Sequence, residues 1–281
     1  MTGAPPSIAV RCPDCGKPVG TLAPSARCPG CGRAFSNDGG VWNLLPGSLD
    51  AAKESEDRAH AVAGTPTWRR LFFHKRYWIE WCAERWLPEI VDRGTRSFLE
   101  VGGGLCYASA LAKARAPGAA VVATDVSPRY LAQHATRVGG ILESPADIYA
   151  AADAEALPFD DEQFDAVYSQ VVLYRLADPA RALREIRRVL APGGRYLGIE
   201  RASPWSGPFH EREARAMADR ARAQGIGERA VRYRDWETIL EAAGLGRDRL
   251  SPVPGDRVRS PRLRRLGNSI RPIYVAIRFT R

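Results

Sequence analysis

From residue 96 onward, short apolar runs alternate with longer amphipathic stretches. The apolar runs are rich in β-branched and aromatic residues and have the length of strands, at 97–101, 121–125, 148–151, 164–169, 195–200 and 273–279. The stretches between them carry apolar residues at helical spacing, at 105–115, 128–138, 179–190 and 235–243. This alternation predicts an α/β fold in which helices cover both faces of a mostly parallel, doubly wound sheet.

The chain before residue 96 is organised differently. Residues 47–67 are polar and rich in Ala, Glu, Ser and Gly, which is typical of a linker. The stretch 68–92 is aromatic-rich and periodic, and predicts a helix or helix pair packed on the following domain. An alternative is that Tyr77 or a neighbour caps a cofactor cleft. The predicted units are a small domain over 1–46, a linker and helical lead-in over 47–92, and a main domain over 93–281.

Composition places the chain among ordinary soluble globular proteins. It has 281 residues, of which 45% are hydrophobic and 26% charged, enough to bury a substantial core. No run of about 18 apolar residues occurs, so we expect no membrane-spanning segment. The first ten residues lack a basic stretch followed by an apolar one, so we expect no secretory signal and a cytoplasmic location.

The net charge of +9 raises the question of a nucleic-acid partner. Residues 247–281 contain ten Arg, no Lys and two Asp, which gives +8, so the rest of the chain is nearly neutral. Arg outnumbers Lys along the whole chain, which indicates a general compositional bias more than a phosphate-binding surface. Nucleic acid therefore remains a less favoured partner than a small molecule.

Four of the six cysteines predict a structural zinc site. Cys12, Cys15, Cys28 and Cys31 follow the spacing C-x2-C-x12-C-x2-C, and a glycine follows each second cysteine. Two such turns can face one ion and fill its tetrahedral coordination, which leaves no open position for catalysis. Zn²⁺ would also supply folding energy that a segment of this size lacks. Two disulfides or a redox C-x-x-C pair are the alternatives, but a reducing compartment disfavours the first.

A glycine-rich turn after the first strand of the main domain predicts a nucleoside site. Gly102, Gly103 and Gly104 follow the strand at 97–101, and Asp125 ends the next strand about 20 residues later. Glycines let a ligand approach the backbone, and a carboxylate can accept both hydrogen bonds of a ribose diol. Tyr107 stands where a pyrophosphate-binding motif has its last glycine, which disfavours a dinucleotide. As structural alternatives, Glu100 could cap the turn and Asp125 could N-cap the following helix.

Residues 96–200 resemble the class I S-adenosylmethionine-dependent methyltransferases. Residues 99–104 (Leu-Glu-Val-Gly-Gly-Gly) are similar to the first motif of that family, which usually reads acid-x-Gly-x-Gly-x-Gly. Residues 187–195 match its segment between helix and fifth strand. Cys106 stands at the third glycine position, a departure that bears on the shape of the loop. The resemblance implies a Rossmann-like fold with an antiparallel last strand, and S-adenosylmethionine as cofactor.

The resemblance also implies roles for individual residues. Asp125 would hold the ribose hydroxyls, and Asp153 with Ala154 would hold the adenine. Gln170 would lie beside the cofactor after the fourth strand. The remaining expected contacts come from the first motif, at Glu100, Gly102, Gly103 and Gly104, and from Tyr77 in the helical lead-in.

Methyl transfer from a sulfonium is an in-line displacement in which proximity and alignment supply most of the rate enhancement. A general base matters when the acceptor is a hydroxyl. The candidates lie after the fourth and fifth strands: His210 as a base, Tyr174 as a pocket residue, and Glu200 to orient the acceptor or a base. The alternative for His210 is a surface or helix-start position.

The insertion at about 202–234 is expected to cover the active site as a lid and to set substrate choice. Trp205 and Phe209 within it favour an apolar or sugar-like acceptor, although a role in the core explains them equally well.

The expected function is methyl transfer to O or N of a small molecule, such as a sugar or secondary metabolite. Residues 11–46 resemble the small zinc ribbons found ahead of or beside methyltransferase domains. A ribbon followed by such a domain also resembles bacterial rRNA guanine methyltransferases, so the alternative is an rRNA or tRNA base methyltransferase that binds RNA with the ribbon and the basic tail. A non-catalytic binding protein is a third reading. The acceptor and the oligomeric state stay open.

Overall fold

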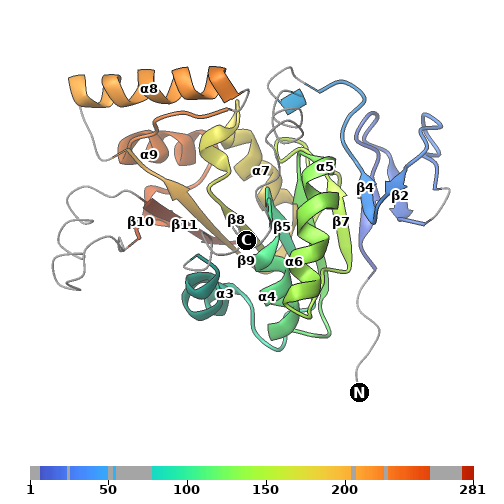
Figure 1. The fold of residues 1–281 in the computed structure, drawn as a ribbon. Coiled ribbons are helices and arrows are strands. Elements are labelled where there is room, and N and C mark those ends of the chain that lie inside the picture. The colour runs from blue at the N-terminus through green and yellow to red at the C-terminus, as the bar shows by residue number, and fades with distance from the viewer. Residues whose placement is uncertain are drawn as a thin grey trace.

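The computed structural model describes residues 7–23, 26–49, 53–54, 78–203, 207–224, 227–253 and 274–281. These residues form a nine-stranded sheet in the order β10-β11-β9-β8-β5-β6-β7-β4-β3 (Figure 1). Its parallel centre consists of β5 (Ser97–Val101), β6 (Ala120–Asp125), β7 (Ile148–Ala151), β8 (Phe164–Gln170) and β9 (Leu190–Arg201). At one edge β11 (Tyr274–Thr280) runs antiparallel to β9, and β10 (Leu250–Pro252) runs antiparallel to β11. The predicted α/β fold with an antiparallel last strand is confirmed.

Helices cover both faces of this sheet. One face packs against η1 (Cys82–Trp86), α3 (Leu87–Ile90), α4 (Tyr107–Arg115) and the continuous α5 (Pro128–Tyr130), η2 (Leu131–Ala135) and α6 (Thr136–Ile141). The other face packs against α7 (Pro179–Val189), α8 (Pro208–Gln224) and α9 (Tyr233–Ala242). Two short 3-10 turns, η3 (Leu173–Arg175) and η4 (Arg247–Arg249), follow β8 and α9. No helix within the described ranges combines the length and the apolarity that crossing a membrane requires.

The central strands are apolar on both sides because both sides are covered. In β5 every residue is buried, with Phe98 in the core under α3 and α4 and Leu99 in the core under α7. Successive side chains of a strand point to opposite faces, so one strand contributes to two cores. This double burial fixes β5 at the middle of the sheet, and with it the turn that follows.

The predicted strand and helix boundaries hold to within a few residues, with one difference. The sequence predicts a helix over 179–190 and a strand from 195, but α7 ends at Val189 and β9 begins at Leu190. Leu190 already pairs with Phe164, and the register shifts before Arg195 pairs with Ala166. Pro192, Gly193 and Gly194 therefore lie in an irregular start of the strand rather than in a separate turn.

The N-terminal segment forms two hairpins, β1 (Ala9–Arg11) with β2 (Pro18–Thr21) and β3 (Asn37–Asp38) with β4 (Val41–Asn43). The second hairpin extends the central sheet, because β4 pairs in parallel with β7, with Val41 opposite Tyr149. The first hairpin also contacts the main domain through a bridge between Val10 and Phe159. Figure 1 shows these strands beside β7, at the edge opposite β10.

Apolar side chains of the N-terminal segment and the main domain share one core. Val10 and Leu44 belong to the same buried cluster as Leu157, Phe159 and Phe164. The rings of Phe159 and Phe164 meet edge to face with centroids 5.3 Å apart. The two parts of the chain are therefore joined by main-chain pairing and by apolar burial together.

Replacing Phe159 by Ala should lower the free energy of unfolding by about 3–5 kcal/mol, because it leaves a cavity in this shared core. Phe159 is fully buried, whereas Phe209 on α8 is 67% exposed and supplies the matched control. For Phe209→Ala we expect a change within about 0.5 kcal/mol. Urea unfolding followed by circular dichroism measures both, and equal losses in the two variants would contradict the shared core.

Candidate functional site

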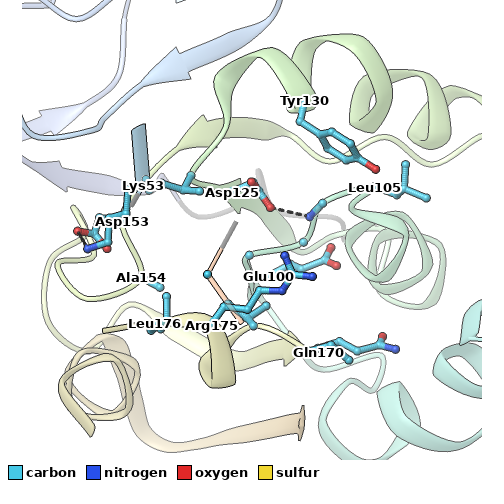
Figure 2. Close-up of a pocket in the computed structure, with 18 of the residues that line it drawn as sticks. Lys53, Glu100, Leu105, Asp125, Tyr130, Asp153, Ala154, Gln170, Arg175 and Leu176 are labelled. Carbon is cyan, nitrogen blue, oxygen red and sulfur yellow. Dashed lines mark hydrogen bonds and ion pairs between the residues drawn. The ribbon is translucent and has the colours of Figure 1, made fainter. Parts of the chain in front are cut away.

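A cavity of about 240 Å³ opens at the carboxyl ends of the parallel strands. Its wall contains residues that follow β5, β6, β7 and β8, together with residues from more distant segments (Figure 2). The described lining residues are Lys53, Glu100, Gly102, Gly103, Gly104, Leu105, Tyr107, Asp125, Val126, Tyr130, Ala152, Asp153, Ala154, Gln170, Val171, Val172, Arg175, Leu176, Ala177 and Gly227. All the expected cofactor contacts that fall on described residues are therefore on one cavity; Tyr77 lies outside the described residues.

The turn after β5 depends on glycine for steric reasons. Gly102 has φ +63°, and a Cβ atom there would lie 2.6 Å from both Cγ atoms of Val172. A Cβ on Gly103 would lie 2.8 Å from the Glu100 carboxyl carbon. Side chains at these positions would displace the neighbouring strand ends, so only a bare backbone keeps this part of the cavity open.

Cys106 explains how the turn tolerates the absence of a third glycine. It precedes α4 with φ 52° and ψ 34°, the left-handed conformation that glycine adopts without cost. For a residue with a side chain this conformation costs on the order of 1 kcal/mol. Burial of the thiol side chain and the hydrogen bond from Cys106 N to Gly103 O, at 2.9 Å, hold it in place. The departure from the motif therefore leaves the loop shape intact.

Glu100 caps the helix that follows the glycine turn and also lies on the cavity wall. Its Oε2 accepts hydrogen bonds from the Ser109 amide at 2.7 Å and the Ser109 hydroxyl at 2.6 Å, so it caps the first turn of α4. It also lines the cavity. Burial raises the pKa of Glu100 to about 7, although the bonds from Ser109 lower it. A carboxyl that can be neutral or charged thus stands at the base of the glycine turn.

Asp125 links the ends of β5 and β6. One carboxylate oxygen accepts a hydrogen bond from Gly104 N at 2.9 Å, drawn as the dashed line in Figure 2. The other accepts one from Ser127 N at 3.0 Å. The helix at Pro128 is N-capped by Ser127, whose hydroxyl accepts from Tyr130 N at 3.2 Å. The alternative that Asp125 is the N-cap is therefore wrong, because Ser127 takes that position.

Asp153 and Ala154 line the cavity beyond β7, next to a cation that the sequence did not indicate. Lys53 Nζ lies 2.7 Å from Asp153 Oδ2 and also bonds the carboxylate of Glu155. Lys53 comes from the segment between the N-terminal hairpins and the main domain. Nothing in its local sequence distinguishes it from a solvent-exposed linker lysine, so only the folded structure reveals this contact.

Gln170 ends β8 and is held by two phenols. Its amide oxygen accepts hydrogen bonds from Tyr107 and, at 3.0 Å, from Tyr168. The next residue, Val171, has φ +59°, an unusual conformation for a β-branched side chain. Its amide donates to Ile199 O at 2.7 Å, which holds the chain in this conformation as it enters the cavity wall. Local strain of this kind is common where a backbone is shaped around a ligand.

The three predicted catalytic residues do not line the cavity. Glu200 is fully buried, and its carboxylate accepts from the backbone amides of Val172 at 3.2 Å and Leu173 at 3.0 Å, so it caps η3. Tyr174 is buried, with its hydroxyl donating to Glu228 at 3.3 Å. His210 lies at the start of α8, with Nδ1 3.1 Å from the Ser203 hydroxyl.

The charged residue of η3 that reaches the cavity wall is Arg175, whose side chain is labelled in Figure 2. The sequence predicts its neighbour Tyr174 as the pocket residue instead, and no local signal marks Arg175. Phe209 is exposed on α8, and Trp205 lies outside the described residues.

The four N-terminal cysteines come together as the sequence predicts. Their sulfur atoms all lie within 4.8 Å of one another, with Cys12 to Cys31 at 3.6 Å and Cys15 to Cys28 at 3.4 Å. A tetrahedral Zn²⁺ site with bonds of about 2.3 Å has sulfur–sulfur edges of about 3.8 Å, whereas a disulfide bond is about 2.05 Å. This four-cysteine cluster fits a zinc site with four thiolate ligands, and its thiols form no disulfides.

Comparison with known proteins identifies the main domain. Residues 99–198 match the family described as "Methyltransferase domain". This part of the chain is a methyltransferase domain, in agreement with its resemblance to the class I S-adenosylmethionine-dependent methyltransferases. The methyltransferase domain is 37% identical over 131 residues to a demethylmenaquinone methyltransferase of Thermus thermophilus, which covers 44% of this chain and 58% of that one. It is 37% identical over 116 residues to the malonyl-[acyl-carrier protein] O-methyltransferase of Erwinia pyrifoliae, 41% of each chain. The chain thus spans less than two thirds of these relatives.

Solved structures confirm the methyltransferase fold. An S-adenosylmethionine-dependent methyltransferase from Mesorhizobium loti aligns with a TM-score of 0.53 at 20% identity, covering 72% of this chain and 98% of that one. A Haloferax volcanii complex of the Trm112 methyltransferase activator with a putative methyltransferase gives a TM-score of 0.53 at 19% identity, covering 82% and 96%.

Gly102→Ala should lower the free energy of unfolding by about 1–3 kcal/mol, because a Cβ atom would strain the backbone and displace Val172. Gly118→Ala is the control, since a Cβ there meets no atom within 4 Å. Urea unfolding of both variants measures the difference. Equal effects would show that the turn after β5 can relax around a side chain.

Glu200 predicts a specific pH dependence of stability. Burial raises its pKa to about 7, so the folded chain holds a proton that the unfolded chain loses above about pH 4.5. The stabilisation of the folded state by this proton is complete below pH 4.5 and is lost as the pH rises through 7. Relative to Glu200→Gln, the native protein should lose on the order of 3 kcal/mol between about pH 4.5 and 8. Urea unfolding at both pH values tests this, and parallel pH profiles for the two proteins would contradict it.

Proposed function

We propose that the protein transfers a methyl group from S-adenosylmethionine to O or N of a small molecule by in-line displacement. The observation that carries this proposal is the cavity built by the glycine turn and the Gly104–Asp125 hydrogen bond, inside a domain of the methyltransferase family. Bound S-adenosylmethionine would supply an activated methyl group on a positively charged sulfur.

The residues on the cavity fit this cofactor. Asp125 would hold the ribose hydroxyls, because its carboxylate stands at the carboxyl end of β6. Asp153 and Ala154 would hold the adenine, and Gln170 would lie beside the cofactor. The bare backbone of the glycine turn and the carboxyl of Glu100 suit the amino-acid part, which needs close approach and a partner for its ammonium group.

The residues of this chain would contribute to the reaction by positioning the cofactor and the acceptor. Proximity and alignment supply most of the barrier reduction in a displacement of this kind. The acceptor would lie toward the part of the wall formed by Val171, Val172, Arg175 and Leu176, after β8. His210, Tyr174 and Glu200 do not line the cavity, so we assign none of them to the reaction itself. Glu200 and Tyr174 instead fix the η3 turn from which Arg175 reaches the cavity.

The names of the relatives favour a metabolite acceptor. They refer to demethylmenaquinone and to malonyl-acyl-carrier protein, neither of which is a nucleic acid. Another relative, from Idiomarina loihiensis, is named as a ubiquinone/menaquinone C-methyltransferase. A quinone-type ring carbon is therefore a second candidate acceptor beside O or N.

The charges near the N-terminal ribbon give less support to RNA. Arg11 pairs with Asp160 at 2.8 Å, and Arg33 pairs with Asp14 at 2.7 Å. At the other end of the chain Arg281 pairs with Glu162 at 2.7 Å. Cations that are already paired release fewer counterions on contact with phosphates and so add less binding energy. Most of the basic tail lies outside the described residues.

Incubation with methyl-labelled S-adenosylmethionine and separate pools of small metabolites and RNA tests the proposal. We expect label in the small-molecule fraction. Asp125→Ala should weaken binding of S-adenosylhomocysteine about 100-fold, since removal of a charged hydrogen-bond partner costs about 1.5–3 kcal/mol and the turn loses its link to β6. Asp248→Ala, at an exposed acid, is the matched control and should bind normally. Label confined to RNA, or undiminished binding by Asp125→Ala, would refute it.

A further inference from the structure

Lys53 is a largely shielded cation at the end of the cavity that we assign to adenine. Its side chain is 14% exposed, and those of Asp153 and Glu155 are 9% and 7% exposed. Lys53, Asp153 and Ala154 all line the cavity, and Figure 2 shows Lys53 and Asp153 side by side. An ion pair so shielded from water is much stronger than one on the surface.

The two carboxylates need this cation. Asp153 Oδ1 accepts a hydrogen bond from Glu155 N at 2.9 Å, and the carboxylate of Glu155 also accepts from Asp178 N. Two buried carboxylates that share one site repel each other, and the positive charge of Lys53 between them offsets this repulsion. The exposed Arg229 lies in the field of Glu155 and Asp178, whereas Lys53 bonds Asp153 directly.

The start of the segment that carries Lys53 is fixed by the four-cysteine cluster. Asp14 lies between Cys12 and Cys15, and its carboxylate accepts a hydrogen bond from Gly47 N at 2.7 Å. Arg33, just after Cys31, pairs with Asp14 at 2.7 Å and donates to Leu45 O at 2.5 Å. Both cysteine turns therefore hold the chain at 45–47, six residues before Lys53.

We propose that Lys53 is a positioning residue for the cofactor, and that it couples the four-cysteine cluster to cofactor affinity. Lys53 holds the Asp153 carboxylate in one orientation, so that it accepts a hydrogen bond from the adenine amino group. The cysteine turns, through Asp14 and Arg33, set where Lys53 can reach. This inference rests on the proposed assignment of Asp153 to the adenine.

Titration calorimetry with adenosine and with S-adenosylhomocysteine tests the first part. Lys53→Met should weaken both ligands about tenfold, the effect of losing roughly 1.4 kcal/mol. Lys53→Arg, which keeps the charge, should stay within about threefold of the native protein. Lys113→Met is the matched control, because Lys113 pairs with Asp147 at 2.8 Å and does not line the cavity. It should bind both ligands normally.

Inosine separates positioning from simple loss of structure. It carries an oxygen in place of the adenine amino group, so it offers the Asp153 carboxylate no hydrogen-bond donor at that position. The native protein should prefer adenosine to inosine, and Lys53→Met should reduce that preference. A loss of structure would weaken both nucleosides equally and overturn the role of Lys53.

Asp14→Ala tests the coupling, since it releases Gly47 while all four cysteines remain. Its zinc content, measured by mass spectrometry, should stay at that of the native protein, and its affinity for adenosine should fall. The double variant Asp14→Ala/Lys53→Met should bind no more weakly than Lys53→Met alone, because both changes act through one contact. Additive losses would overturn the coupling.

The outcomes distinguish this inference from the proposed function. If the native protein binds neither adenosine nor S-adenosylhomocysteine, the proposed function fails. If it binds them and Lys53→Met binds equally well or more tightly, the function stands and the inference is overturned. Tighter binding by Lys53→Met would mean that Lys53 competes with the ligand for the Asp153 carboxylate.

Discussion

The hydrogen bond from Gly104 N to the Asp125 carboxylate is the interaction on which the site depends. It joins the turn after β5 to the end of β6, two neighbouring strands whose registers are set by the sheet. The turn can make this bond because Gly102 and Gly104 adopt positive φ angles and because no side chain fills the space beside Val172. This part of the cavity wall is thus fixed by backbone geometry.

Around this bond, several buried carboxylates act as anchors for backbone amides. Glu100 caps α4, and Glu200 caps η3. Each has a pKa of about 7 because it is buried. Burial of these acids is unfavourable, but their hydrogen bonds to backbone amides fix a turn beside the cavity. Such groups hold the turns in one position, which is what a reaction that depends on alignment requires.

Much of the fold and of the cofactor site could be predicted from the sequence. Strand 97–101 and the glycines after it follow from a buried apolar run that ends in residues able to adopt positive φ. Asp125 follows from its place at the end of a strand, Asp153 from the family resemblance, and Cys12, Cys15, Cys28 and Cys31 from their spacing. These signals are local, because a motif keeps its residues close along the chain.

Contacts between distant segments could not be predicted in this way. Lys53 meets Asp153 across 100 positions, and neither residue is marked by periodicity. Glu200 is an acid at a strand end, as a catalytic residue would be, but its amide partners depend on how η3 folds back. The pairing of β4 with β7 also escaped prediction, because Val41–Asn43 is too short to show a strand pattern of its own.

The pairing of β4 with β7 has a consequence for the rest of the sheet. A parallel sheet exposes a row of unpaired amides and carbonyls along its outermost strand, and another chain can add to that row. The hairpin of β3 and β4 covers this border of the methyltransferase domain. The outermost strand on this side is therefore the two-residue β3 rather than the four-residue β7. A short edge strand leaves few unpaired groups to which another chain could add.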